Sequence, residues 1–413
     1  MTLTPEPSVR LSDLRQAARE RFDSLPWPTR TDEEWRRTDP ASLPLKELGL
    51  QAADSALNVG WEPLPPAWAQ AGVIVTDLAS AQKKHPELLE QYLFQSGRTE
   101  GLAKFVALHQ ALSQQGLFCY VPEGVRLDSP LNLWMEPRGD GATLFPHLLL
   151  VLGRGASAVV IDERRGPAGG RGPSGGNGGS PLFSDEMAEI FLGPEAELQY
   201  IHLQRWGRQV TEVYTQRALL EGESQLVSVT IGLGGKLTKA NVETVLQGPA
   251  ARSELLGVLS GSDDQHYDFH TLQDHRAKAT WSDLLYKSAL SGEAKAIYTG
   301  LIRIAKQAQK SDAYQANRSL LLSQGASADS IPMLEIEADD VRCTHGVAVG
   351  PVDEEQLFYL MSRGLEAAQA ERLIVEGFFE PVFRRLPSEN LRQGLMAEVM
   401  RQLTGGGDDH IDG

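Results

Sequence analysis

Short runs of apolar residues, separated by turn residues, occupy the middle of the chain from residue 116 to about residue 352. The runs are rich in Val, Ile, Leu and Tyr, and no helical pattern of ten or more residues separates them. Alternating strands and helices would require such patterns, so this texture predicts an all-β region. The clearest predicted strands are 148–152, 159–161, 198–203, 226–231 and 297–304.

A loose internal repeat runs through the same region. In each copy a leucine is followed within a few positions by glycine, then by a small residue, and then by another apolar run. Stacked coils of a parallel β-helix would produce this repeat, because each coil turns at small residues and buries its apolar rungs on the next coil. Ordinary hairpins in a sandwich remain the alternative, and periodicity favours the β-helix only modestly. The copies begin at Leu152, Leu192, Leu220, Leu246, Leu290 and Leu322, roughly 25 to 45 residues apart.

The flanking parts of the chain have helical patterns instead. Residues 1–115 are expected to be mainly helical, and Thr31 to Glu34 has the form of a capping box. In such a box the Thr31 hydroxyl accepts from the Glu34 backbone N–H while the Glu34 carboxylate reaches back. The predicted helices of this part are 11–22, 85–94 and 101–112.

Residues 353–413 are predicted to form a compact helical unit. Asp353 and Ser388 are expected to cap its first and last helices, and Gly364 to end the first. Between them, 365–386 has an amphipathic pattern that suits docking of a partner. Its apolar residues are Leu373, Ile374, Phe378, Phe379, Val382 and Phe383.

Composition narrows the class of protein further. The 413 residues carry a formal net charge of -16, whereas nucleic-acid binding requires clustered Lys and Arg. No apolar run is long enough to span a bilayer, and the N-terminus has no apolar signal core, so a cytoplasmic protein is expected.

The chain has only two cysteines, Cys119 and Cys343. A disulfide framework is therefore not expected, and two thiols cannot build a four-cysteine metal or cluster site. If the protein binds a metal or a cluster, other molecules must supply most of the ligands.

Two glycine-rich segments raise the question of nucleotide or phosphate binding, which is the less favoured interpretation of both. The segment 232–236 lacks the first glycine of a phosphate loop, and Leu237 follows its lysine where Ser or Thr is required. A turn between strands is the better interpretation. The segment 166–180 is too rich in glycine to bury a core and is predicted to be a surface loop.

His266, Asp268 and His270 alternate, so on a strand they point to one face. With His275 nearby a metal site is conceivable. We favour instead a polar outer face whose side chains are bonded to neighbours.

The densest chemical segment is Asp-Asp-Val-Arg-Cys-Thr-His-Gly at 339–346. Cys343 and His345 are two residues apart and share a face of an extended strand. Thiolate and imidazole both bind iron or zinc, but this pair offers at most half a coordination sphere.

Around this segment the sequence resembles the SufB/SufD family of SUF scaffold proteins. The resemblance covers most of the chain and is weakest in about 40–95 and around the glycine-rich loop. The Cys-Thr-His-Gly form is similar to the SufD branch, since SufB-like chains are usually longer and carry more cysteines. The matching segments are Glu-Trp-Arg-Arg-Thr at 34–38, Ser-Asp-Ala-Tyr-Gln-Ala-Asn-Arg at 311–318, Pro-Met-Leu-Glu-Ile at 332–336, 339–346 and Leu-Phe-Tyr-Leu-Met-Ser-Arg-Gly at 357–364.

The resemblance implies a right-handed parallel β-helix core, 116–352, flanked by helical regions at 1–115 and 353–413. It implies a non-enzymatic scaffold that acts with a SufB-type subunit and a SufC-type ABC ATPase, the latter docked on the C-terminal helices. It also implies that a transient nascent Fe–S cluster forms at the interface of the two scaffold subunits. The histidine matching His345 contributes to that site, and the cysteine matching Cys343 lies close by.

Three alternatives stay open at this point. The chain could be a SufB-type main scaffold, a β-helix polysaccharide lyase or hydrolase, or a purely structural subunit in which His345 is dispensable. Whether the isolated chain forms a homodimer, whether it binds flavin and which proteins accept the cluster also stay open.

Overall fold

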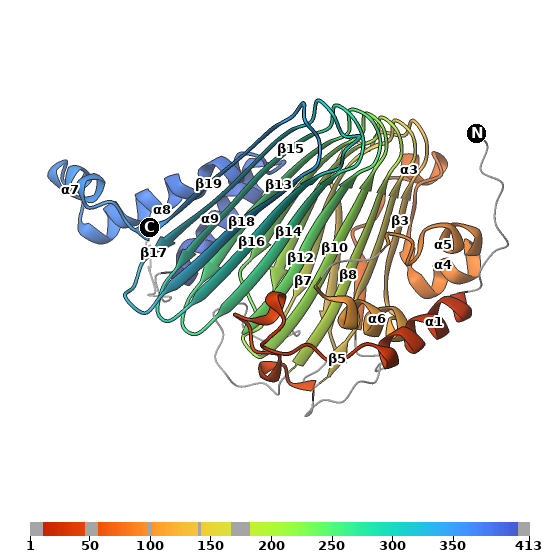
Figure 1. Cartoon of the computed structure of the whole chain (residues 1–413), viewed down its shortest axis with the longest axis horizontal. Coiled ribbons are helices and arrows are strands. Elements are labelled where there is room, and N and C mark those ends of the chain that lie inside the picture. The colour runs from red at the N-terminus through yellow and green to blue at the C-terminus, as the bar shows by residue number, and fades with distance from the viewer. Residues whose placement is uncertain (1–10, 46–56, 98–100, 139–141, 167–181, 404–413) are drawn as a thin grey trace.

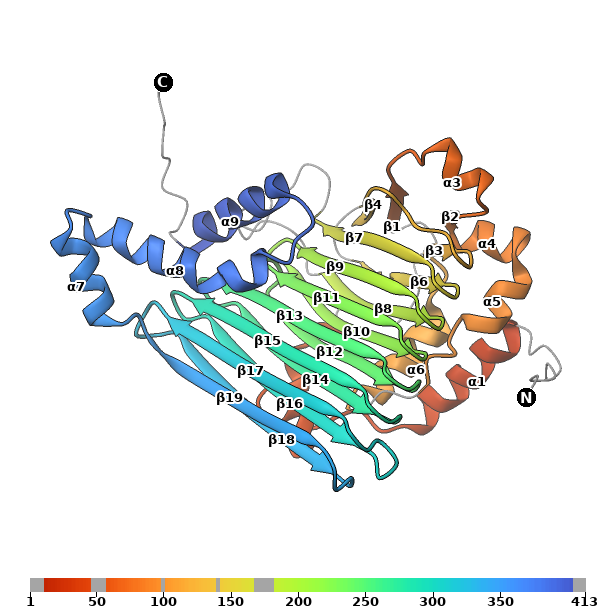
Figure 2. The same cartoon turned by 90° about the horizontal axis from the view of Figure 1, so that it is seen from above.

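Two long β-sheets face each other across one core in the computed structural model (Figures 1 and 2). The structure describes residues 11–45, 57–97, 101–138, 142–166 and 182–403. Within these residues, successive strands of the main body alternate between a nine-stranded and a ten-stranded sheet, so the chain winds as a solenoid. The predicted parallel β-helix is confirmed, with about eight turns.

The two sheets are called A and B. All pairings within them are parallel except two antiparallel ones near the start of the solenoid, β1 with β4 and β2 with β3. Sheet A consists, in order, of β1 (Leu57–Trp61), β4 (Leu131–Pro137), β7 (Ser157–Arg165), β9 (Glu197–Arg205), β11 (Gln225–Gly232), β13 (Arg252–Gly261), β15 (Trp281–Leu290), β17 (Asp312–Leu321) and β19 (Arg342–Pro351). Sheet B consists of β2 (Ile74–Asp77), β3 (Gly116–Val121), β6 (His147–Leu152), β8 (Leu182–Leu192), β10 (Val210–Leu220), β12 (Leu237–Leu246), β14 (His266–His275), β16 (Lys295–Ile304) and β18 (Ser327–Ile336), with the short β5 (Thr143–Leu144) beside β8.

The repeat seen in the sequence corresponds to the corners between the sheets. At three successive corners the chain passes through a left-handed residue: Glu195 (φ 63°), Glu223 (φ 61°) and Ala250 (φ 59°). Each corner also stacks on the next, for example through the bond from Glu195 N to Gly222 O at 2.9 Å. Because every coil turns with similar backbone geometry, its inner residues fall into register with those of the next coil.

Helices cover the outer faces of both sheets. None of the described helices is long and apolar enough to cross a membrane. Sheet B is covered by the N-terminal elements and sheet A by the last two helices (Figure 2). The elements are α1 (Leu11–Ser24), the 3-10 turns η1 (Glu33–Trp35) and η2 (Pro40–Ser42), α3 (Pro66–Gln70), α4 (Leu78–Lys84), α5 (Pro86–Tyr92), α6 (Ala103–Leu112), α7 (Glu354–Ser362), α8 (Ala367–Phe383) and α9 (Glu389–Leu403).

The predicted caps of the C-terminal helices are confirmed. The Asp353 carboxylate accepts from Glu355 N at 2.8 Å, and the Ser388 hydroxyl accepts from Leu391 N at 3.2 Å. The amphipathic face of α8 has a different role from the one expected. Most of its apolar residues pack against the outer face of sheet A, so they are not available to a partner; these are Val375, Phe379, Val382 and Phe383.

The start of the solenoid is closed. Trp68 of α3 is buried in the main core beneath the antiparallel strands, and its indole N–H donates to Asp128 Oδ1 at 3.2 Å. The last coil, by contrast, has no further strand on β18 or β19 within the described part of the chain.

The predicted capping box at Thr31 is wrong. Asp32 is the N-cap residue of η1, and its carboxylate accepts from Thr29 N at 2.7 Å instead of from the helix. The Glu34 carboxylate turns away from the helix start and lies 3.1 Å from His270 Nδ1 on β14. The ion pair between Glu34 and His270 of sheet B thus replaces the predicted capping hydrogen bond within the turn.

Glu34 belongs to a network that fastens the N-terminal segment to the outer face of sheet B. Lys239 Nζ donates to Asp268 Oδ2 at 2.8 Å and to Glu34 O at 2.6 Å. The Thr38 hydroxyl donates to Asp268 and lies 3.1 Å from His266 Nε2. We call these residues, with His270, the N-terminal clamp.

The favoured interpretation of the histidine-rich strand is therefore confirmed: its outer side chains are bonded to neighbours. His275 points to the opposite face of β14, into the core, where it lies 2.8 Å from Thr280 Oγ1 and 2.9 Å from Ser282 Oγ. It does not meet the other two histidines.

The surroundings of the two outer histidines shift their pKa values in opposite directions. Burial opposes the imidazolium of His270, but hydrogen bonds to Asp268 and Glu34 outweigh it and raise the pKa of His270 above its usual value. Burial, together with nearby lysines, lowers the pKa of His266 to about 4. His270 is therefore the charged member of the pair under mildly acidic conditions, and His266 is neutral.

Replacing His270 should destabilise the protein in a pH-dependent way. Because the folded-state pKa of His270 is raised, its contribution is fully present below about pH 6.5 and is lost as pH rises through the folded value. His270→Asn should therefore lower Tm more near pH 6 than near pH 9. The matched control, His266→Asn, should show the opposite trend and lower Tm less near pH 6 than near pH 9, because the depressed pKa of His266 makes its burial costly where the unfolded chain binds a proton. A larger loss for His270→Asn at the alkaline pH would contradict this account.

Phe379 should be the main anchor of α8. Its ring is 0% exposed and packs against Phe378 and Phe383 with centroids 5.1 and 6.3 Å away. Phe379→Ala should lower the free energy of unfolding by about 3 kcal/mol or more in urea titrations. Leu373→Ala, on the same helix but 48% exposed, should change it by less than about 0.5 kcal/mol. Equal effects would mean that α8 is not held by this face.

Candidate functional site

The open end of the solenoid carries both residues that the sequence singled out. On β19, Cys343 and His345 lie beside Ala313 and Gln315 of β17 in the parallel register. Ala313 and Gln315 are buried between the sheets, so Cys343 and His345 occupy the equivalent inward positions of the last coil. The expected sharing of one strand face is thus what the structure has.

The last coil lacks the neighbour that covers every earlier coil. Ile336, Val347 and Val349 occupy inward positions but are 41%, 45% and 41% exposed. Sequence reasoning missed this apolar surface. The alternation of 342–351 holds the signal, because its inward positions continue the pattern of a buried strand just before the chain turns helical.

Cys343 and His345 differ in how far they reach solvent. Cys343 is half-buried against a small cluster that includes Ile302 and Ala313. Burial, reinforced by the charge of Asp312, raises the pKa of Cys343 to about 11, so the free chain holds a thiol there and not a thiolate. His345 is exposed. Cys119 of β3 is fully buried in the core near the opposite end of the solenoid, where burial raises its pKa above the usual range.

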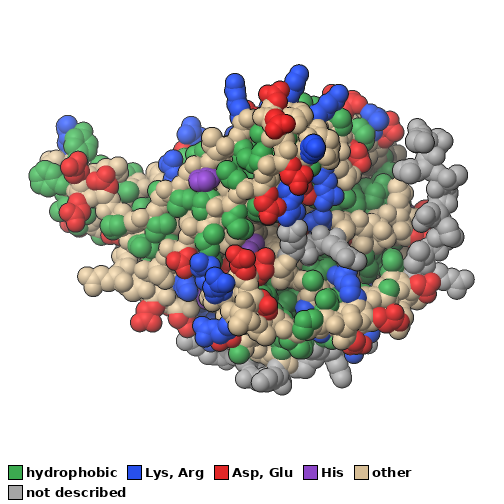
Figure 3. Space-filling model, in the orientation of Figure 1, with side chains coloured by type: hydrophobic (Ala, Val, Ile, Leu, Met, Phe, Trp, Pro, Cys, Tyr) green, Lys and Arg blue, Asp and Glu red, His purple; other side chains and the backbone are tan. Residues whose placement is uncertain are grey.

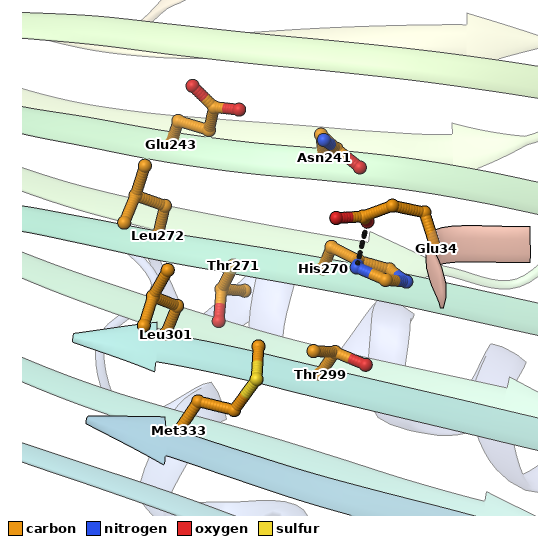
Figure 4. A pocket seen from close by; sticks show the side chains of 9 residues that line it. All are labelled: Glu34, Asn241, Glu243, His270, Thr271, Leu272, Thr299, Leu301 and Met333. Atoms are coloured by element: carbon orange, nitrogen blue, oxygen red, sulfur yellow. Dashed lines mark ion pairs between the residues drawn. The ribbon is translucent and has the colours of Figure 1, made fainter. Parts of the chain in front are cut away.

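A small pocket lies on the outer face of sheet B beside the N-terminal clamp (Figure 4). Glu34 and His270 point toward one another at one side of it, and Leu272, Leu301 and Met333 line the other. Its volume is about 40 Å³, enough for little more than water. The Glu34 carboxylate that faces it is already engaged with His270, so the pocket has the character of a hydrated crevice.

An ionic cluster that the sequence reasoning missed lies inside the solenoid. Ligand atoms of Asp162, Glu186 and His202 all lie within 4.8 Å of one another, in a fully buried position. Arg164 bridges the two carboxylates, with Nη1 2.5 Å from Asp162 Oδ1 and Nε 2.6 Å from Glu186 Oε1. The guanidinium supplies the positive charge that a metal would otherwise provide.

The acid groups of this cluster respond differently to Arg164. Burial raises the pKa of Glu186 to about 7, although Arg164 partly offsets it. Burial also opposes ionisation of Asp162, but Arg164 and His202 together hold the pKa of Asp162 below its usual range. The sequence signal of this cluster is that Asp162 and Arg164 continue the inward positions of β7 that begin with the apolar Ala158 and Val160.

The segment 232–236 forms the turn between β11 and β12, as expected, with Gly235 in the left-handed region at φ 77°. No helix follows it, so it cannot present a helix N-terminus to a phosphate. The predicted loop 166–180 lies outside the described residues apart from Gly166.

Two protein-family models match the chain. The family model described as SUF system FeS cluster assembly, SufBD core domain, matches residues 135–378, and that of the SufBD protein N-terminal region matches 64–133.

Curated relatives give the same result. The chain is 30% identical over 334 residues to the iron-sulfur cluster assembly protein SufD of Bacillus subtilis (strain 168), covering 80% of this chain and 74% of that protein. It is 32% identical over 293 residues to an iron-sulfur cluster assembly SufBD family protein of Mycobacterium leprae, covering 69% and 71%. A Staphylococcus epidermidis protein of the same family is 30% identical over 361 residues, covering 86% and 76%. With a family model spanning more than half of its length and these relatives, the chain belongs to the SufBD family of iron–sulfur cluster assembly proteins.

Proposed function

We propose that this chain is a SufD-type scaffold subunit that joins a SufB-type subunit through its open end, where a nascent Fe–S cluster is held as cargo. The observation that carries the proposal is the uncovered last coil with His345 on it, in a chain of this family. The scaffold itself needs no catalytic residue, because it only holds and releases the cluster.

The open end suits a second β-helix. The outer edges of β18 and β19 offer backbone N–H and C=O groups, and Ile336, Val347 and Val349 offer apolar surface beside them. An incoming coil would extend both sheets by backbone hydrogen bonds and cover these side chains. The partner would thus cover the last coil in the same way that each earlier coil is covered by the next.

The chain brings few ligands to such an interface. His345 is exposed, and a neutral imidazole can bind iron without losing a proton. Cys343 would have to lose a proton from a half-buried thiol whose pKa is about 11. We therefore assign His345 the ligand role and Cys343 an auxiliary one, with the partner supplying the remaining thiolate or carboxylate ligands.

The SufD assignment within the family rests on the sequence. The chain has two cysteines, one of them buried, and glycine follows His345 where SufB-like chains have Glu. The alternative, a SufB-type main scaffold, would have to assemble a cluster with one accessible thiol. A SufB-type chain would pair with a SufD-type subunit, so co-expression with each type separates the two assignments.

The ATPase partner is assigned to the C-terminal unit, 353–413, which we treat as one of three regions beside 1–115 and 116–352. Since α8 uses its apolar face against sheet A, we place the docking surface on α7 and the neighbouring turn of α8. Figure 3 shows hydrophobic side chains on the projecting α7, with acidic ones beside them. The exposed apolar residues there are Phe358, Tyr359, Met361 and Leu373.

His345→Ala should leave folding and assembly nearly intact but reduce cluster formation roughly tenfold or more. An exposed imidazole contributes little to the core, whereas loss of a ligand weakens a site that already has few. The measurement is complementation of a strain lacking its SufD-type subunit, with complex assembly checked by co-purification.

Thr344→Ala is the matched control, because Thr344 lies on the same strand with its side chain on the opposite face. It should complement fully, and Cys343→Ser should have a milder effect than His345→Ala. Full activity of His345→Ala would remove the imidazole from the mechanism and favour a purely structural subunit.

Phe358→Asp should weaken ATPase binding without unfolding the protein. Phe358 is 74% exposed, so the change should leave Tm within about a degree or two, but a buried aromatic at an interface commonly carries 2 kcal/mol or more of binding. Affinity for a SufC-type ATPase, measured by calorimetry, should fall at least about tenfold.

Gln356→Asp adds the same charge to the same helix two residues earlier, on roughly the opposite face. It should bind the ATPase as tightly as the unmodified chain. Undiminished binding by Phe358→Asp would move the docking surface away from α7.

A further inference from the structure

A cavity of about 100 Å³ lies among the N-terminal helices, away from the open end and from α7. It is bounded by α1, α4, α5 and the chain just after α6, which lie side by side in both views (Figures 1 and 2). Most of its wall is apolar: Leu11, Leu78, Ala79, Leu89, Leu93 and Phe94.

Among the residues that the structure describes, Arg15 of α1 is the one charged residue in this wall. One guanidinium nitrogen, Nη2, donates to Ser113 O at 3.1 Å. Another, Nε, is buried and has no hydrogen-bond partner among the residues that the structure describes. No described carboxylate forms an ion pair with Arg15, and burial lowers the pKa of Arg15 with no opposing acid.

The Arg15 guanidinium can therefore donate a further hydrogen bond and accept a counter-ion. Placing a cation against apolar walls without a counter-charge costs free energy, and a buried donor without an acceptor adds to that cost. Arg164 and Arg205 avoid the first cost, because each contacts two acidic side chains. The Arg15 guanidinium therefore gives this cavity the chemistry of an anion-binding site.

We propose that this cavity binds a small aliphatic carboxylate, with the carboxylate on the Arg15 guanidinium and the hydrocarbon chain against the leucines. Guanidinium and carboxylate match in geometry and form charge-assisted hydrogen bonds. Inorganic anions would pair with Arg15 but would leave the apolar wall unfilled. Neutral alcohols would fill the wall and leave Nε without a charged acceptor.

The size of the cavity limits the ligand. A cavity of about 150 Å³ accommodates benzene, with six heavy atoms, so about 100 Å³ suits a chain of roughly four carbons beside a partly exposed carboxylate. Gln82 and Gln114 stand at the wall as further hydrogen-bonding groups. A ligand there would contact α1, α4 and α5 together and so stabilise their packing.

Isothermal titration calorimetry on the full chain at low salt tests the proposal with three probes: butyrate, 1-butanol and inorganic phosphate. Butyrate should bind saturably at one site, and 1-butanol and phosphate at least about tenfold more weakly. No saturable butyrate binding, or phosphate binding as tight as butyrate, would overturn it.

Variants assign the binding to the cavity. Arg15→Gln should weaken butyrate binding at least about tenfold. Arg19→Gln, one turn further along α1 with a side chain 50% exposed, should leave it unchanged. Ala79→Phe should block the cavity while keeping Arg15, and it decides the question if Arg15→Gln fails to fold. Undiminished binding by Ala79→Phe, or an equal loss with Arg19→Gln, would place the butyrate elsewhere.

Discussion

Stacking of one coil on the next is the constraint on which the rest of this structure depends. A parallel strand satisfies its backbone only through neighbours on both sides, and its inward side chains are buried only when the next coil covers them. Each interior coil meets both conditions. The last one does not, and this is why His345, Val347 and Val349 reach solvent although they occupy positions that are core positions elsewhere.

The same constraint explains the flanking helices. The outer face of each sheet carries side chains that are buried by an element distant in the sequence. Sheet A recruits α8 through Phe379 and its neighbours, and sheet B recruits the segment around Glu34 through Lys239 and Asp268. The helical units are thus parts of the solenoid's packing first, and only the surfaces that remain, such as α7, are free for partners.

Much of the fold could be predicted because its signals are local. Strand runs, the leucine–glycine repeat and the caps at Asp353 and Ser388 all depend on residues a few positions apart. The alternation that puts Cys343 and His345 on one face is local as well.

The failures involve partners distant in sequence. Glu34 left its expected capping box because His270, more than two hundred residues later, offers a stronger, partly buried ion pair. The face of α8 was expected to be free because the sequence does not reveal which sheet it covers. Arg164 and Glu186 belong to different sheets, and only the packing of the two sheets brings them together.

The two ends of the solenoid are chemically unlike, and this limits how large an assembly can grow. If both ends were uncovered parallel coils, copies could stack head to tail without limit and form fibres. Here the first coils finish in antiparallel strands with Trp68 beneath them, so an incoming last coil finds no parallel template at that end. The pairing proposed for the open ends would therefore close after one step and yield a discrete pair, without further polymerisation at this edge.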